Sequence, residues 1–413
     1  MNVIIINDFA YSNGGASKVA IDSALGLVRK VDKVLYFSAV GPPTSEMSSS
    51  DIEVICLGQA DILSDSNRLR AAIQGLWNKQ AADRFKKELL KHSPGNTIIH
   101  VHSWTKALSS SVIDQASRHG FKIILTLHDY FSVCPNGGFY NYQKKQICNL
   151  KPLSLECIRA QCDIKNYSHK LYRVGRQLVQ SKVGQIPLEV NNYIYVSEFS
   201  KSILEPLLPE DSNYYPVKNP IVAKHYKPAD ISNNSSFVMV GRLAAEKGPQ
   251  LFLDAVHNLN TSGVMVGDGD WRPLDIEKYK SVEFTGWLSQ EEVMTKISCS
   301  KALIFPSLLY ETQGLTVLEA ASLGVPAIVP DTCAARDLII DGETGLVFKS
   351  GDLQDLQSKM KILLNDTGYL MALGENAYEK FWKEPPTLDR HVNELLNVYN
   401  KVLNPESNKC AIE

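Results

Sequence analysis

The sequence of 413 residues has no excess of charge of either sign and no long apolar run. Lys and Arg number 43 and Asp and Glu number 45, which excludes the strong basic excess of a dedicated nucleic-acid-binding protein. No apolar run approaches the roughly 18 residues that a membrane-spanning helix needs. Met1 to Asp8 has no basic segment, and its apolar run is too short for a signal peptide. We therefore expect a cytoplasmic protein that has no nucleic-acid partner.

Cysteine is sparse, and the chain has no Cys-x-x-Cys pair. Four of the eight cysteines nevertheless fall within a loop at 134–162, namely Cys134, Cys148, Cys157 and Cys162. Cysteines of a cytosolic protein are more often thiols or metal ligands than disulfides. A structural zinc ion needs four such ligands, but the usual zinc spacing is missing here. The alternatives are a zinc site, free thiols that pack as small hydrophobic groups, and a redox disulfide.

Short apolar, β-branched runs alternate with helical stretches, in two successive sets. The length predicts two to three domains, and two is the preferred number. The strands expected in the first set are Val3–Asn7, Thr97–His102, Lys122–Leu127 and Tyr193–Val196, with helices at Ser17–Arg29 and Thr105–Arg118. Those expected in the second are Phe237–Val240, Gly263–Val266, Val282–Phe284, Ala302–Phe305 and Ala327–Val329, with helices at Pro249–Leu259 and Ser289–Ile297. This alternation predicts an α/β fold with parallel sheets that are covered on both faces.

A proline-rich connector separates the two sets, and it places the domain boundary near residues 217–235. We expect a first domain at 1–218, a second domain at 219–385, and a C-terminal helix within 386–413 that could return to the first domain. Parallel sheets bind ligands outside the carboxyl ends of their strands. Two such domains in one chain therefore predict a ligand in the cleft between them.

The strongest motif is a pair of glutamates, Glu311 and Glu319, with seven residues between them. A helix that begins near Gly314 would place Glu311 in a loop and Glu319 inside the helix, so the two carboxylates reach different parts of one ligand. The helix N-terminus between them offers N–H groups and a positive dipole end to a phosphate. Carboxylate oxygens also accept hydrogen bonds from paired sugar hydroxyls. The alternative is a surface helix with two unrelated glutamates.

A second motif follows the expected strand Phe237–Val240 and carries Arg242 and Lys247. Arg grips phosphate oxygens in a bidentate manner, and Lys supplies a compact point charge. Together they would oppose the charge that develops on a departing diphosphate. A solvated basic loop is the alternative.

Weaker signals stand at the carboxyl ends of the first-domain strands. The adjacent glycines Gly14 and Gly15 permit positive φ and a close approach of the backbone to a ligand, although they also suit a tight turn. His100, His102 and His128 can donate to a sugar hydroxyl or a phosphate oxygen, or they can be structural. His128 is the preferred candidate because Asp129 and the cysteine-bearing loop follow it.

The segment 164–188 holds five cations and no acidic residue, with apolar residues interleaved at partly helical spacing. These cations are Lys165, Lys170, Arg173, Arg176 and Lys182. A basic amphipathic helix can rest on the anionic inner leaflet of a membrane, which predicts peripheral contact. The alternative is a solvated basic face over the core.

In combination and in this order, these motifs resemble the retaining glycosyltransferases of family four (glycosyl transferases group 1). The residues that carry the resemblance are Gly14-Gly15, His128-Asp129, Gly241-Arg242-Leu243 with Glu246-Lys247-Gly248, Phe284-Thr285-Gly286, and Glu311 to Glu319. The resemblance implies the GT-B fold, in which two Rossmann-like domains face each other across a cleft. It spans nearly the whole chain and is most specific in the second domain. The stretch 134–162 is no part of the family's motif set, which leaves the acceptor side open.

The resemblance also implies a role for each residue. Arg242 and Lys247 would bind the diphosphate of a nucleotide-sugar donor, and Glu319 its ribose hydroxyls. Glu311, with the backbone of Gly314, Leu315 and Thr316, would face the transferred sugar and its phosphates. His128 would act at the reaction centre, and Gly14 and Gly15 would border the acceptor and the diphosphate.

The implied reaction is sugar transfer, with retention at the anomeric carbon, to a hydroxyl of a saccharide or lipid-linked acceptor. It requires no metal cofactor, because positive side chains substitute for one. The family association suggests surface polysaccharide or lipopolysaccharide biosynthesis. The alternatives are a nucleotide-sugar 2-epimerase of the same fold and a non-catalytic nucleotide-sugar-binding or interaction protein.

Overall fold

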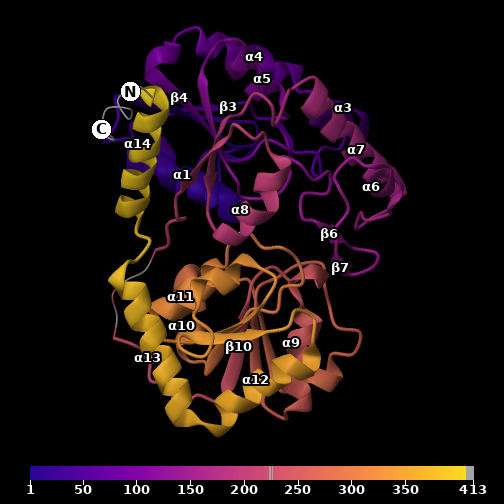
Figure 1. Cartoon of the computed structure of the whole chain (residues 1–413), viewed down its shortest axis with the longest axis vertical. Coiled ribbons are helices and arrows are strands. Elements are labelled where there is room, and N and C mark those ends of the chain that lie inside the picture. The colour runs from indigo at the N-terminus through magenta and orange to yellow at the C-terminus, as the bar shows by residue number, and fades with distance from the viewer. Residues whose placement is uncertain (223–224, 226, 406–413) are drawn as a thin grey trace.

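The computed structural model describes residues 1–222, 225 and 227–405, which form two α/β domains, one above the other (Figure 1). Each domain contains one large sheet, and every strand pair within these two sheets is parallel. The predicted fold class is therefore confirmed. In the described part of the chain, no helix is long and apolar enough to cross a membrane.

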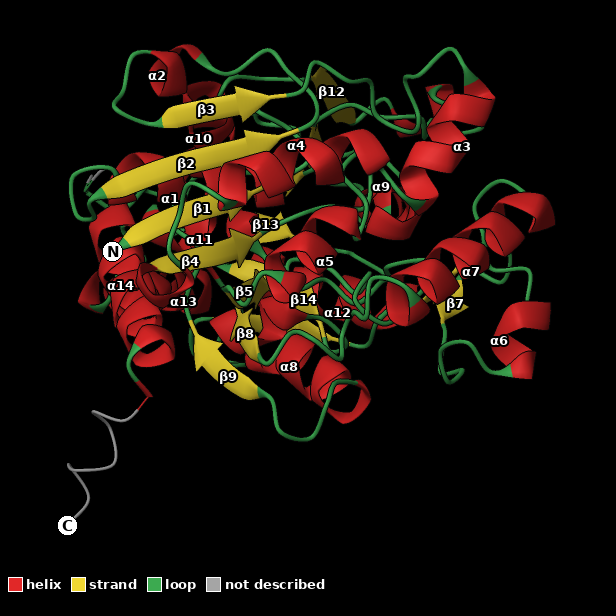
Figure 2. Cartoon of the chain, turned by 90° about the horizontal axis from the view of Figure 1, so that it is seen from above, coloured by secondary structure: helices red, strands yellow, loops and turns green. Residues whose placement is uncertain are grey.

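The first sheet has seven strands within the described residues, in the order β3-β2-β1-β4-β5-β8-β9 (Figure 2). Its strands are β1 (Asn2–Ile6), β2 (Lys33–Ser38), β3 (Glu53–Cys56), β4 (Thr97–Val101), β5 (Lys122–Thr126), β8 (Asn192–Tyr195) and β9 (Asn213–Pro216). Successive side chains of β1 enter different cores: Val3 and Ile5 pack with one cluster, and Ile4 and Ile6 pack with the other. Because strand side chains alternate between faces, an entirely apolar strand needs helices on both sides.

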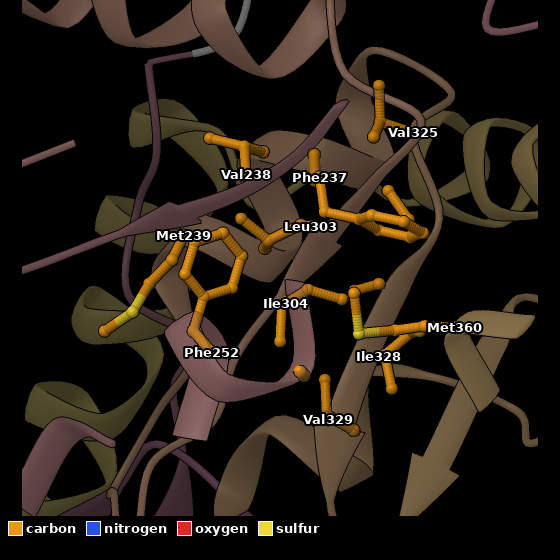
Figure 3. Close-up of a cluster of buried hydrophobic side chains, with 14 of the residues drawn as sticks. Phe237, Val238, Met239, Phe252, Leu303, Ile304, Val325, Ile328, Val329 and Met360 are labelled. Carbon is orange, nitrogen blue, oxygen red and sulfur yellow. The ribbon is translucent and has the colours of Figure 1, made fainter. Parts of the chain in front are cut away.

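The second sheet has six strands among the described residues, in the order β12-β11-β10-β13-β14-β15. Its strands are β10 (Ser236–Val240), β11 (Ser262–Val266), β12 (Val282–Gly286), β13 (Ala302–Ile304), β14 (Ala327–Pro330) and β15 (Gly345–Phe348). Figure 3 shows part of its core, where Phe237 and Leu303 of neighbouring strands lie among buried aliphatic side chains. A short antiparallel pair, β6 (Tyr140–Asn141) and β7 (Gln146–Ile147), lies apart from both sheets.

Helices cover both faces of the two sheets. In the first domain they are α1 (Gly15–Leu27), α2 (Ser45–Ser48), α3 (Arg68–Leu76), α4 (Lys79–Leu89), α5 (Ser111–Arg118), α6 (Leu155–Arg159), α7 (Tyr167–Lys182) and α8 (Glu198–Leu204). In the second they are α9 (Pro249–Asn258), α10 (Gln290–Ser298), α11 (Leu315–Ser322), α12 (Leu353–Asn365) and α13 (Thr367–Lys383), and α14 (Leu388–Leu403) follows. Short 3₁₀ turns are η1 (Pro94–Asn96), η2 (Glu205–Leu207), η3 (Ala245–Lys247), η4 (Glu277–Tyr279) and η5 (Ala334–Leu338).

The helix expected at Thr105–Arg118 is shorter than predicted, because α5 begins only at Ser111. The buried carboxylate of Asp8 accepts hydrogen bonds of 2.9 Å from the backbone N–H groups of Lys106, Ala107 and Leu108. Since these N–H groups point at Asp8, the segment before α5 takes a turn conformation. Six strands, β2, β3, β6, β7, β9 and β15, were not expected either.

The chain passes between the domains twice (Figure 1). It first passes through the connector after β9, and it returns between α13 and α14. The N–H of Ile221 in the first passage donates to the carbonyl of Pro386 in the second, at 3.0 Å. Beyond this point α14 packs on α1, and Leu395 and Tyr399 are fully buried in the core of the first domain.

Because Leu395 of α14 is fully buried, Leu395→Ala should remove apolar contacts and destabilise the first domain by about 2–5 kcal/mol. Asn397→Ala, at an exposed position of the same helix, is the control and should have little effect. Urea-induced unfolding of both variants measures this. Equal stability of the two would contradict the packing of α14 on α1.

Candidate functional site

The chain order of the strands reverses between β1 and β4 in the first sheet and between β10 and β13 in the second. Ligands of open parallel sheets bind at such switch points, beyond the carboxyl ends of the strands. The loops that leave these four strands, at 7–14, 102–110, 241–248 and 305–314, contain five of the predicted site residues, namely Gly14, Arg242, Lys247, Glu311 and Gly314.

Lys247 and Glu311 meet at the switch point of the second sheet. The Lys247 ammonium lies 2.5 Å from Glu311 Oε1, which also accepts a 2.7 Å hydrogen bond from the Ser307 hydroxyl. Lys247 ends the 3₁₀ turn after β10, and Gly248 follows it with φ +72°. A Cβ at Gly248 would lie 2.0 Å from the carbonyl oxygen of Pro306, so glycine is needed to bring the two loops together.

Arg242 is positioned by a buried acid. Its guanidinium donates to Glu246 Oε1 at 2.8 Å, and the other oxygen of Glu246 has no hydrogen-bond partner among the described residues. The side chain of Arg242 is 60% exposed and that of Glu246 only 2% exposed. An exposed guanidinium on a fixed support can bind an incoming anion with its remaining N–H groups.

The N-terminus of α11 is open to a ligand. Gly314 precedes the helix without a side-chain cap, and the first turn has no acidic residue. The hydroxyl of Thr316 in this turn is buried and has no hydrogen-bond partner within the described ranges. Unpaired N–H groups, a positive dipole end and a spare hydroxyl are together suited to phosphate oxygens.

Glu319 lies one turn further along α11. Its Oε1 accepts a 2.8 Å hydrogen bond from Gln290 of α10, and the net effect of burial raises the pKa of Glu319 despite this bond. The motif did not point to Gln290, which lies 29 residues upstream on another helix. Its amide fixes the orientation of the carboxylate that we predicted for paired hydroxyls.

The glycine pair of the first domain faces this helix across the interdomain boundary. A Cβ at Gly15 would lie 3.8 Å from Cδ1 of Leu315. Gly14 precedes α1 with φ +104°, a conformation that L side chains rarely adopt. Gly14 and Gly15 are therefore brought together with the start of α11.

His128 lies at the carboxyl end of β5, and its Nε2 is 2.9 Å from Nδ1 of His102. Burial lowers the pKa of His128 to about 3, so the ring is neutral at physiological pH and one imidazole donates to the other. His100 is structural, because its two nitrogens contact the hydroxyls of Tyr399 and Thr126 at 2.7 Å.

Thr312, inside the two-glutamate motif, connects the domains. Its hydroxyl donates to the carbonyl oxygen of His128 at 2.8 Å, and its own carbonyl accepts from the Ser197 hydroxyl at 2.8 Å. Tyr310 packs beside it against Tyr130 and Phe199 of the first domain. The sequence interpretation missed these contacts, although Thr312 directly follows Glu311.

The cysteine-bearing stretch is not a zinc site. Cys134, Cys157 and Cys162 are buried, but in the described part of the chain no group of three or more His, Cys, Asp or Glu is arranged to hold a metal ion. Cys148, the fourth predicted ligand, is only half-buried. The buried ammonium of Lys170 lies 3.5 Å from the sulfur of Cys157, and a positive charge there opposes a second cation. Structural zinc is therefore not supported.

The β6–β7 hairpin of this stretch lies near the second domain (Figure 1). Burial raises the pKa of Tyr142 to about 12, and the nearby charge of Glu246 contributes to the rise. The hairpin thus lies near the Arg242–Glu246 pair of the second domain.

The cations of segment 164–188 do not share one face. Lys170 and Arg176 of α7 are buried, Arg173 forms an ion pair with Asp163 at 2.6 Å, and Lys165 and Lys182 are exposed. The exposed apolar residues of the segment include Leu171 and Leu178, which lie two helical turns apart and so share a face.

The second domain and the whole fold have known relatives. Residues 224–380 match the family described as Glycosyl transferases group 1. Over 150 residues the chain is 33% identical to alpha-D-kanosaminyltransferase of Streptomyces kanamyceticus, an alignment that covers 33% of this chain and 38% of that protein. The chain thus spans little more than a third of this relative.

Two solved structures resemble nearly the entire chain. Sucrose-phosphate synthase from Thermosynechococcus elongatus has a TM-score of 0.71 at 19% identity, and the match covers 98% of this chain and 100% of that one. Anabaena Alr3699/HepE in complex with UDP and glucose has a TM-score of 0.66 at 13% identity, with coverage of 97% and 100%. At these identities the matches establish the fold alone, which confirms the predicted GT-B architecture. The family match supports the resemblance to family four within residues 224–380.

The raised pKa of Asp129, which follows His128, predicts how the stability of the protein depends on pH. Burial raises its pKa to about 6 from an ordinary 3.8, although its Oδ1 accepts from the N–H of Phe131. A raised carboxyl pKa means that the folded state holds the proton more tightly, so stability decreases as the pH rises from about 4 to 6 and stays lower above that.

The wild type should therefore lose about 1 kcal/mol of its free energy of unfolding between pH 5 and pH 7.5 that Asp129→Asn does not lose. The comparison is the free energy of unfolding in urea at these two values. Asp51→Asn, at an exposed position, serves as the control. A parallel pH dependence in wild type and Asp129→Asn would contradict the raised pKa.

Proposed function

Since residues 224–380 form a glycosyl transferases group 1 domain, we propose that the whole chain is a retaining glycosyltransferase. It moves a sugar from a nucleotide-diphosphate sugar to a hydroxyl of a saccharide or lipid-linked acceptor. Residues 1–218 form the acceptor-side domain, 219–385 the donor-binding domain, and 386–413 the returning helix, of which 406–413 lie outside the described residues. The observation that carries the proposal is the meeting of Lys247, Glu311 and the start of α11 at one switch point.

In this proposal the donor diphosphate lies between Arg242, Lys247 and the N-terminus of α11. The orphaned hydroxyl of Thr316 supports this position, because a phosphate oxygen would give it a partner. Two cations and a helix dipole lower the energy of the negative charge that grows on the diphosphate as the sugar leaves. Gly314, Leu315, Gly14 and Gly15 bring backbone close to the same group.

The carboxylate of Glu319 accepts hydrogen bonds from the ribose hydroxyls of the nucleotide, and Gln290 fixes the orientation of this carboxylate. Glu311 faces the transferred sugar, and the Lys247 ammonium forms an ion pair with its carboxylate. Neutral His128 donates or accepts a hydrogen bond at the reaction centre, which fits a ring whose pKa is lowered to about 3.

Retention follows from attack of the acceptor hydroxyl on the donor face from which the diphosphate leaves. The departing diphosphate accepts the proton of that hydroxyl, so no enzyme nucleophile is needed. Positive side chains take the place of a metal ion. Closure of the two domains excludes water and limits hydrolysis of the donor.

The acceptor is an intermediate of surface polysaccharide or lipopolysaccharide biosynthesis, a proposal that rests on the family resemblance. We also propose that the protein contacts the cytoplasmic face of a membrane peripherally. The exposed Leu171 and Leu178 of α7, with Lys182 at its end, support such contact, because apolar side chains can enter the lipid interface beside a cation.

The first test is a thermal-shift screen against nucleotide sugars, followed by mass spectrometry of products with cell-envelope lipid acceptors. One nucleotide sugar should raise the unfolding temperature, and acceptor mass should increase by one sugar. Turnover of the donor without acceptor would favour the 2-epimerase alternative. Donor binding without transfer to any acceptor would favour a non-catalytic binding protein.

Glu319→Gln and Arg242→Ala should each lower kcat/KM for the donor by about 10–100-fold, because each removes a charge-assisted hydrogen bond. Glu291→Gln and Lys361→Ala, exposed residues of the same domain, are matched controls and should retain activity. Full transferase activity in the double variant Glu319→Ala with Arg242→Ala would refute the donor site.

Metal independence predicts that dialysis against EDTA leaves the transfer rate unchanged, and that added Mg²⁺ does not raise it. The reason is that Arg242, Lys247 and the α11 dipole provide the positive charge. The measurement is the initial rate of sugar transfer from the donor found in the screen, with and without EDTA or Mg²⁺. Loss of activity in EDTA with recovery in Mg²⁺ would contradict this part.

A further inference from the structure

A cavity of about 390 Å³ lies in the first domain between α3, α7 and the loops that follow β4 and β5. Its wall carries five cationic side chains and a histidine: Arg68, Lys106, Lys165, Arg173, Arg176 and His169. Thr105, Ser168 and Tyr172 add hydroxyl groups. Among the described residues that line it, none is acidic, so the cavity concentrates positive charge beside several hydrogen-bond donors.

Most of this charge has no carboxylate partner. Only Arg173 forms an ion pair among the described lining residues, with Asp163. The guanidinium of Arg68 donates instead to backbone carbonyls, including those of Ile62 and Leu63. Lys106 lies 5.5 Å from the ring centroid of Phe9.

Arg176 is the most informative of these side chains, because it is only 8% exposed. Its guanidinium makes two contacts of 3.3 Å, to the carbonyls of Thr105 and Pro135, and lies 4.9 Å from the ring centroid of Phe131. Burial lowers its pKa to about 10, so it is still charged at neutral pH. A buried cation without an ion-pair partner is unfavourable, and an anion in the cavity would compensate it.

The helices that border the cavity expose several apolar side chains, which we call its apolar rim. Leu63 before α3 lines the cavity, and Leu69 and Ile73 on α3 and Leu171 on α7 are exposed on the same two elements. Large exposed apolar side chains around a polar pocket indicate a ligand with a hydrocarbon part. The charge in the cavity and the apolar rim therefore point to an anionic head group on a lipid chain.

The cavity is lined by segments that lead to the first-domain side of the proposed reaction centre. Thr105 and Lys106 are in the loop after β4, which the carboxylate of Asp8 holds in place, and Phe131 is three residues after His128. A head group bound in the cavity would therefore be held by the same loops that lead to His128.

We propose that this cavity binds the phosphate or pyrophosphate group of a lipid-linked acceptor and so places the acceptor hydroxyl beside His128. This rests on the proposed glycosyltransferase function and narrows its acceptor to one that carries a phosphate-linked lipid. The arginines bind the phosphate oxygens, and the rim contacts the start of the hydrocarbon chain.

Isothermal titration calorimetry with monomeric dihexanoyl phosphatidic acid tests the site. The protein carries Arg242→Ala and Lys247→Ala, so that the proposed donor site does not contribute. Inorganic phosphate and hexyl glucoside are titrated in parallel. Phosphatidic acid should bind at least about tenfold more tightly than either, because only it has both the anion and the chain.

Adding Lys165→Glu with Lys106→Gln should weaken this binding by about tenfold or more, whereas Lys87→Glu, an exposed lysine of α4 outside the cavity, should change it less than about twofold. Both substituted cavity lysines are exposed, and an unchanged unfolding temperature verifies folding. Equal binding of inorganic phosphate or of hexyl glucoside, or equal affinity in the cavity variant, would overturn the proposal.

The nucleotide-sugar screen on the unsubstituted protein separates this proposal from the proposed function. Donor binding and transfer without phosphatidic acid binding would refute the cavity alone. Phosphatidic acid binding that depends on the cavity lysines, without any donor binding, would refute the transferase and leave a lipid-phosphate site.

Discussion

The arrangement of the site depends on Thr312, whose two hydrogen bonds attach the loop before α11 to the first domain. Together with other contacts across the boundary, such as the N–H of Phe199 that donates to Asp337 Oδ2 at 2.9 Å, they hold Glu311 and Lys247 in a fixed relation to His128. The side-chain hydroxyl holds the carbonyl of the residue that we place at the reaction centre. The rings of Tyr130 and Phe199 pack against Tyr310 beside these bonds, so polar and aromatic contacts together join the two domains here.

The sequence predicted the α/β class and the parallel sheets because fully apolar strands such as β1 must be covered on both faces. It also predicted which side chains gather in the second domain. Lys247 and Glu311 are 64 residues apart, but each follows a strand of the same parallel sheet, and neighbouring parallel strands end at one edge. Their positions after two strands of one parallel sheet were therefore enough to predict that they meet.

Other features depend on tertiary contacts that local patterns do not contain. The turn conformation before Ser111 is due to the carboxylate of Asp8, about a hundred residues upstream. The run of cations in 164–188 suggested one basic surface, yet Lys170 and Arg176 point inward, to cysteine sulfur and to backbone carbonyls. Helical periodicity does not distinguish a buried cation from an exposed one when its compensating partners lie elsewhere in the chain.

The paired passages between the domains have a consequence for movement. A hydrogen bond joins Ile221 and Pro386, so the two segments together form one hinge between the domains. Rotation about the line through both segments leaves that bond intact, while a twist or a sliding displacement would shear it. This bond therefore favours rotation over sliding as the relative movement of the two domains, with the pivot where the two passages lie side by side.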